Sequence, residues 1–180
     1  MDDPTEEIHK KLHEDAEKTG DKSIMKIALS SALIAVLAAT ASLFSEHQNN
    51  EAMLDQLRAS DNWSYYQAKG IKSSVLESRI ETFKAFGKTY NPAWDEKIAA
   101  YKNEQEEISR QATEQQAASA RHLNAHNKLS YAVTILQIAI GLSAIAALTR
   151  RRWLWLGSIG ISVAGLGFLV WGLGLIALIK

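Results

Sequence analysis

The chain contains no cysteine, and only two of its 180 residues are proline. The absence of cysteine excludes disulfide bonds, thiolate catalysis and cysteine metal ligands. The scarcity of proline leaves most of the chain free to form helix, because proline interrupts helices. Acidic and basic residues balance at 20 each, so the composition offers no excess of positive charge for nucleic acid. We therefore expect an all-α protein without nucleic-acid partners.

Three stretches of the chain also lack every Asp, Glu, Lys, Arg and His, although 22% of all residues are charged. A helix of about 20 apolar residues crosses the hydrocarbon core of a membrane. The stretches are residues 27–44, 129–148 and 153–179, and they predict three transmembrane helices, over residues 24–45, 129–149 and 153–179. Because the apolar stretches contain no ionisable side chain, a proton relay or a voltage sensor would lack its usual groups.

The basic residues around the first span predict its orientation. Lys18, Lys22 and Lys26 precede the apolar stretch, and no Lys or Arg follows it until Arg58. Lys and Arg near the ends of membrane spans are enriched on the cytoplasmic side. The N-terminus is therefore expected in the cytoplasm, and residues 46–128 on the opposite side of the membrane.

The link between the second and third spans indicates the same orientation. It consists of Arg150, Arg151 and Arg152, which we expect to lie in the cytoplasm. Trp153 and Trp155 follow directly, where aromatic side chains commonly mark the membrane–water interface. These five residues are predicted to contact lipid headgroups and to determine the topology.

Residues 46–128, between the first two spans, are polar and predict a long antiparallel helical hairpin. Apolar residues recur there at steps of three and four, as on one face of a helix. Gly87 suits the C-terminal cap of one helix, and Asn91 followed by proline suits the start of the next. A heptad-like seam over residues 94–123 indicates coiled-coil-like pairing. The tip of the hairpin is expected near residues 87–92.

The first 23 residues predict a short cytoplasmic amphipathic helix. Asp3 suits its N-cap, and Gly20 suits its end. His9 and His13 lie four residues apart and therefore share one face of this helix. We interpret this face as solvated.

Histidines near the membrane ends of the hairpin suggest a metal site. In an antiparallel hairpin, His47 and His126 fall at one height, and His122 and Glu51 fall one turn further out. Three imidazoles and a carboxylate are suitable ligands for zinc or another transition metal. The alternative is that these histidines bond to lipid headgroups or water.

An aromatic cluster occupies the middle of the first arm of the hairpin. Trp63, Tyr65 and Tyr66 are three large aromatics within four residues, so they cannot all face one seam. We expect Arg110 of the second arm at the same height, where its guanidinium could stack on Trp63 or Tyr66. The cluster is either a surface for a partner or ligand, or a packing contact between neighbouring arms.

Small residues recur at helical spacing in two of the predicted spans. Such stripes let helices approach closely in lipid, either within one protomer or between subunits. The third span carries Gly157, Gly160, Ala164, Gly167 and Gly174, and the first carries Ser31, Ala35, Ala39 and Ser42.

Several segments resemble a known family. Residues 45–52, 59–69, 132–137 and 147–155 are similar to a bacterial membrane family known as domain of unknown function 4337. The segment 59–69, with the sequence ASDNWSYYQAK, carries the most specific part of the resemblance, which extends over residues 24–178. The resemblance implies one span, a helical insert, two terminal spans and a bacterial inner membrane. It implies no activity and therefore no catalytic residue.

These observations favour a non-enzymatic inner-membrane scaffold or accessory subunit without a cofactor. The chain has no phosphate-binding glycine loop and no nucleophile-elbow motif. Long arms and small-residue spans favour a homo-oligomer that presents its arms to an envelope partner outside the inner membrane. One alternative is a protein that binds or senses a divalent metal through the membrane-proximal histidines. Another is an oligomeric channel, for which Thr134, Gln137 and Ser143 would give a sparse polar lining.

Overall fold

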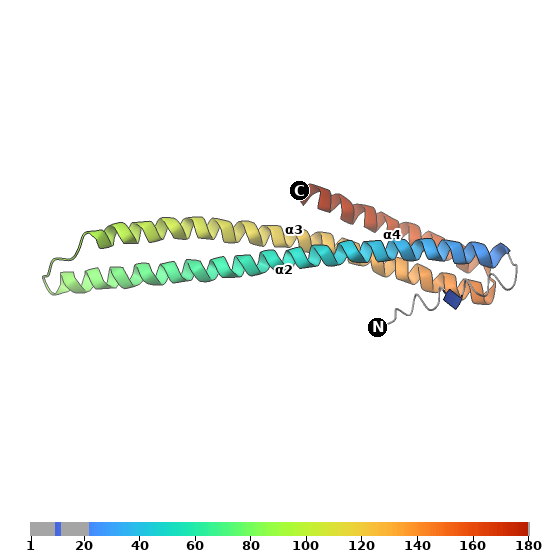
Figure 1. Ribbon diagram of the computed structural model, residues 1–180, viewed down its shortest axis with the longest axis horizontal. Coiled ribbons are helices and arrows are strands. Elements are labelled where there is room, and N and C mark those ends of the chain that lie inside the picture. Colours follow the sequence, from blue (N-terminus) through green and yellow to red (C-terminus); the bar gives the residue numbers. More distant parts are fainter. Residues whose placement is uncertain (1–9, 12–21, 180) are drawn as a thin grey trace. The chain divides into compact units, whose positions relative to one another are not determined.

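The computed structural model describes residues 10–11 and 22–179. All regular secondary structure in this part of the chain is α-helical. The three long helices are α2 (Lys22–Ala85), α3 (Ala93–Thr149) and α4 (Arg152–Ile179), in the order that Figure 1 shows.

The N-terminal helix that we predicted lies almost entirely outside the described residues, and so do His9 and His13. Of residues 1–23, residues 10 and 11 are described and helical, and residues 22 and 23 already belong to α2.

Each of the three helices contains a segment long and apolar enough to cross a membrane. The prediction of an all-helical protein with three such helices is therefore confirmed. α2 has 64 residues and α3 has 57, whereas about 20 residues suffice for a bilayer core. Both helices thus continue well beyond their apolar segments, without a break.

The chain divides into two compact units, and each is described here by itself. Residues Met1–Asn50 and His122–Lys180 form one, which we call the apolar unit. Residues Glu51–Arg121 form the other, which we call the arm unit.

The core of the apolar unit combines residues from all three helices. Gly165 and Gly172 let α4 approach α3, because a Cβ atom at either position would lie within 2.9 Å of the side chains of Leu136 or Leu129. Small and branched apolar residues interlock around these contacts. The buried residues of the two main clusters are Ile34, Ala38, Leu136, Ala139 and Ile140, and Ala41, Leu129, Ala132 and Leu169.

The arm unit consists of the second half of α2 and the first half of α3, which contact each other along their length. Residue numbers rise along α2 as they fall along α3 from one contact to the next. Hydrogen bonds, ion pairs and ring contacts join Asn62 to Gln115, Lys69 to Glu104, Glu77 to Lys102 and Phe83 to Trp94.

The seam predicted for α3 is confirmed over most of its length. Ile98, Ile108, Ala112 and Ser119 are buried at its centre. The placement of Leu123 on this seam is wrong, because the residue is 45% exposed. The heptad spacing identifies the buried face until the pattern reaches the apolar unit, where α3 packs in a different environment.

Gly87 ends α2 as its position in the sequence predicted. Its φ of 64° lies in the left-handed region, which costs glycine little. The Gly87 N–H donates to the carbonyl of Lys84 at 3.0 Å, and the Lys88 N–H donates to that of Phe83 at 2.9 Å. These two bonds satisfy carbonyl groups that the helix end leaves without partners.

Asn91 caps the start of α3, also as predicted. Its side-chain oxygen accepts a hydrogen bond from the backbone N–H of Ala93 at 3.0 Å. Asp95 and Glu96 follow in the first turn, where negative charge stabilises the positive end of the helix.

The arginine link is shorter than predicted, because Arg152 already belongs to α4. Arg150 turns the chain with a φ of 54°, a conformation that non-glycine residues rarely adopt. Arg150, Arg151 and Arg152 are all exposed.

Candidate functional site

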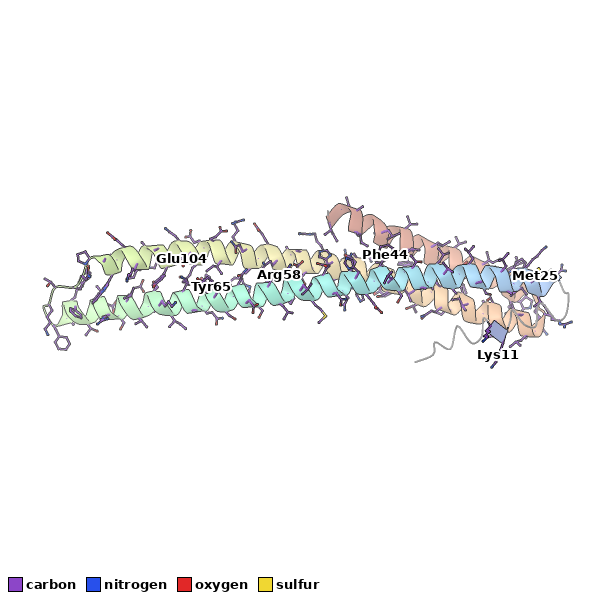
Figure 2. The ribbon with its side chains drawn as sticks, in the orientation of Figure 1. Lys11, Met25, Phe44, Arg58, Tyr65 and Glu104 are labelled. Atoms are coloured by element: carbon purple, nitrogen blue, oxygen red, sulfur yellow. The ribbon has the colours of Figure 1, made fainter. Side chains whose placement is uncertain are left out.

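Lys69 forms the centre of the aromatic cluster in the arm unit. Its side chain is only 11% exposed, and its Nζ forms an ion pair with Glu104 of α3. Nζ also lies 5.1 Å from the ring centroids of Tyr65 and Tyr101. Figure 2 shows Tyr65 on α2 and Glu104 on α3. The bond to Glu104, and then that to Tyr65, raise the pKa of Lys69 above its usual value. A charged lysine therefore joins the two helices between two aromatic faces.

Gly70 leaves space for a side chain of the facing helix. The amide of Gln105 donates from Nε2 to the backbone oxygen of Tyr66 at 3.2 Å. A Cβ atom at Gly70 would lie 2.8 Å from that Nε2. Because Gly70 has no side chain, the Gln105 amide can approach α2 closely enough to donate to this backbone oxygen.

Arg110 does not stack on the aromatic cluster as we expected. Trp63 and Tyr66 pack edge to face at 5.5 Å between centroids, and the described residues show no cation–π contact of Arg110 with either ring. Its guanidinium instead binds the carboxylates of Glu107 and Glu114, each at 2.6 Å. Both glutamates lie one turn away on the same helix, so they reach Arg110 without crossing to α2.

This ion-pair network changes the ionisation of the surface. The hydrogen bond from Arg110 lowers the pKa of Glu107, and the bond to Glu107 raises that of Arg110. The paired Arg110 and Glu114 lie at the edge of a groove on the arm unit. The groove has a volume of about 640 Å³ and is lined by Tyr66, Lys102, Gln105, Glu106, Ser109, Arg110, Thr113 and Glu114.

Of the four arm residues expected to contact a partner or a neighbouring arm, two line this groove, namely Tyr66 and Arg110. Tyr65 belongs instead to the Lys69 contact, although half of its surface stays exposed. Trp63 is half-buried against Tyr66. The cluster therefore serves partly to pack the two helices and partly to line an open surface.

Two of the three hairpin histidines form contacts between helices in the apolar unit. His122 Nδ1 lies 2.7 Å from the side-chain oxygen of Gln48. His126 Nδ1 lies 2.9 Å from the backbone oxygen of Ser45. Gln48 and Ser45 are both buried, whereas His47 is exposed. Sequence reasoning missed Gln48 and Ser45, although both lie within two residues of His47 and are one helical turn apart.

These contacts do not gather a metal site. Across residues 10–11 and 22–179, no three His, Asp or Glu side chains are grouped so that they could hold a metal ion. The structure therefore does not bring His47, Glu51, His122 and His126 together as a ligand set. Because Nδ1 of His126 donates to the backbone oxygen of Ser45, the same nitrogen cannot act as a base for the Ser45 hydroxyl. The hydrogen bonds of His122 and His126 join α2 to α3 within the apolar unit.

The glycine stripe expected on α4 lies on its exposed face. Gly157, Gly160, Ala164 and Gly167 are exposed, and a Cβ atom at Gly160 or Gly167 would meet no atom within 4 Å. A second set of small residues, missed by sequence reasoning, forms the buried face: Ser158, Ser162, Gly165 and Gly172, with Leu169.

Aromatic residues mark both ends of the apolar unit. Near the arginine link, Trp155 donates from Nε1 to the hydroxyl of Ser30 at 3.1 Å, while Trp153 is exposed. At the start of the apolar part of α3, Lys128 Nζ lies 4.4 Å from the ring centroid of Trp171. Tryptophan and lysine at these places suit the two membrane–water interfaces.

The family described as "Domain of unknown function (DUF4337)" matches residues 23–175. The chain belongs to the DUF4337 family. Neither the curated proteins nor the solved structures gave a significant match. The resemblance noted in the sequence is therefore confirmed, and membership in DUF4337 brings no assigned activity.

The structure gives a physical account of the most specific DUF4337 segment, residues 59–69. Ala59 and Lys69 face α3 from buried positions, and Asn62 donates to Gln115 at 3.0 Å. Tyr66 supplies the backbone oxygen for Gln105. In this DUF4337 chain, the segment thus supplies three of the polar contacts that join α2 to α3 in the arm unit, at Asn62, Tyr66 and Lys69.

Proposed function

We propose that this DUF4337 protein is a non-enzymatic scaffold of a bacterial inner membrane. Its three apolar segments would span the membrane, with the N-terminus and the arginine link in the cytoplasm. Residues 46–128 would project into the periplasm as an antiparallel, coiled-coil-like hairpin. Several copies would associate through their arms and spans, and together present a surface to an envelope partner.

The observation that carries this proposal is an apolar stripe on the outside of the arm unit. Leu57, Ile71 and Val75 of α2 are between 60% and 65% exposed. Ile71 follows Leu57 by two heptads and Val75 lies one turn further, so the three side chains share one face of the helix. Exposed apolar stripes in water mark surfaces that associate with another protein.

The residues that α2 buries against α3 explain why this stripe stays free within one chain. They are mainly small or polar, and include Ala52, Ala59, Lys69 and Ser73. A pair of helices joined in this way buries little apolar surface, which is typical of helices that need further partners.

The exposed glycine face of α4 supports association in the membrane as well. The protomer already uses a different small-residue face of α4 for its own packing. Small residues on an outer face of a membrane helix let another helix approach closely, and van der Waals contact then stabilises the pair. The groove lined by Tyr66 and Arg110 is the surface that we propose for the envelope partner.

Native mass spectrometry of the full chain in mild detergent tests the proposal. We expect one defined number of subunits. The double variant Ile71→Ser/Val75→Ser should lower the oligomeric fraction and leave the helical content unchanged, because both side chains are exposed in the protomer. Lys72→Ser is the matched control, since Lys72 is exposed on the same helix but outside the stripe.

A wild-type protein that is monomeric in both detergent and lipid would overturn the proposed scaffold. An oligomer that is unaffected by the double variant would show that the stripe does not carry the association.

A further inference from the structure

The polar side chains in the apolar segments mostly have hydrogen-bond partners within the chain. Serine and threonine hydroxyls donate to the carbonyl of the preceding turn or to each other. Those with such a bond are Ser30, Ser31, Thr40, Ser45, Ser130, Thr134, Ser143, Thr149, Ser158 and Ser162.

Gln137 and Ser42 are the exceptions among the serine, threonine and glutamine side chains. Within the described part of the chain, neither side chain has a recorded hydrogen-bond partner. Both nevertheless line the same groove of the apolar unit, which has a volume of about 360 Å³. Its other lining residues are Ala35, Ala38, Ala39, Leu43, Glu46, Val133 and Ile140. The two amide and hydroxyl side chains without such a bond therefore lie on one surface, between α2 and α3.

Gln137 lies deep in the apolar segment of α3. Along the axis of α3, at a rise of about 1.5 Å per residue, it lies ~13 Å from Lys128 and ~18 Å from Thr149. A primary amide at this depth finds no water, and leaving its donors and acceptor without partners is unfavourable. Polar side chains within membrane spans therefore usually face a partner helix.

We propose that a second copy of this chain packs on this groove, with Gln137 of each copy hydrogen-bonded to Gln137 of the other. Copies in one membrane share the same orientation, so their twofold axis runs along the membrane normal. Equivalent residues near that axis meet at equal depth. A primary amide both donates and accepts, so two identical amides satisfy each other reciprocally.

The small residues of the groove make such an approach possible. Ala35, Ala39 and Ser42 leave space beside α3, and small side chains let membrane helices come close together. A lipid tail would fill the space but has no group that can bond to the amide. Lipid headgroups lie at the interface, ~13 Å from this depth. The inference rests on the proposed homo-oligomer and names one of its contacts.

Cysteine crosslinking of the full chain in membranes tests the contact. The natural chain has no cysteine, so a single substitution gives an unambiguous product. We expect Gln137→Cys to form disulfide-linked dimers on mild oxidation, because a disulfide requires Cα atoms about 4.4–6.8 Å apart. Ile138→Cys is the control at nearly equal depth, since Ile138 is 56% exposed but does not line the groove.

A second pair of variants tests the hydrogen bond itself. Gln137→Leu should weaken dimerisation in lipid by about threefold to tenfold, whereas Gln137→Asn should retain most of it. Oligomers that form normally, with no crosslink at position 137 and no effect of Gln137→Leu, would overturn this inference and leave the scaffold proposal intact.

Two further results have distinct meanings. Loss of tightly bound lipid from Gln137→Leu, without loss of subunits, would overturn the inference in favour of a lipid occupant. A monomeric wild type would overturn both the scaffold proposal and this contact.

Discussion

At the scale of single residues, polar side-chain contacts join α2 to α3 in the arm unit. Lys69 is held between Tyr65, Tyr101 and Glu104. Gln105 reaches a backbone oxygen of the facing helix. Such contacts contribute little per bond, but they are directional. They therefore specify which residues face each other more than they stabilise the pair.

The contact between Gly70 and Gln105 gives a prediction at this scale. Gly70→Ala should change the free energy of unfolding little, because a gain in helix propensity of about 1 kcal/mol is offset by displacing the Gln105 amide, at about 1 kcal/mol. In a Gln105→Ala background, the same substitution should stabilise the protein by about 1 kcal/mol. Denaturant unfolding followed by circular dichroism measures both effects. Equal effects in the two backgrounds would contradict the account.

At the scale of helices, the ion pairs between α2 and α3 predict a dependence on pH. The hydrogen bond from Lys102 lowers the pKa of Glu77 below 4.5, its ordinary value. A lowered pKa in the folded state contributes stability above the unfolded value, and this contribution is lost as the pH falls through the folded value. The arm unit should therefore lose stability as the pH falls below about 4.5.

Thermal unfolding between pH 7 and pH 3 measures this loss. Glu77→Gln should make the acid limb less steep, because the glutamine does not titrate. Glu81→Gln, at an exposed position on the same helix, should leave the limb as steep as in the wild type. An equal change in both variants would argue against a specific role of the Glu77–Lys102 pair.

The two faces of α4 give a second prediction for helices. Gly165→Leu should destabilise the protomer by about 1–3 kcal/mol, because a Cβ atom there already lies 2.9 Å from Leu136. Gly160→Leu should leave the stability of the protomer unchanged and lower the oligomeric fraction, since no atom of the protomer lies near that position. Thermal unfolding and native mass spectrometry separate the two effects. The same result for both variants would show that the two faces are equivalent.

At the scale of the whole molecule, the proposed orientation places the arms outside the inner membrane. Ser64→Cys, at an exposed arm position, should react with a membrane-impermeant thiol reagent in cells with a permeabilised outer membrane. Thr149→Cys, next to the arginine link, should react only after the inner membrane is opened. The reverse pattern would show that the positive charges do not set the proposed topology.

Much of the fold follows from local patterns in the sequence. The left-handed φ of Gly87 and the side-chain cap of Asn91 agree with the predicted helix ends. The three apolar stretches correspond to three helices that could span a membrane. The candidate sites were less predictable. Arg110 binds the glutamates of its own helix, and the histidines bond to Gln48 and Ser45.

The sequence by itself determined the helices, their ends and the residues that share each face. These properties depend on neighbours within a few positions, where backbone geometry is regular. Only the tertiary structure decided which face α4 buries. It turned the small residues of α4 at 158, 162, 165 and 172 inward, and left the glycines at 157, 160 and 167 exposed. Both faces have the helical period, and only the shape of the facing helices distinguishes them.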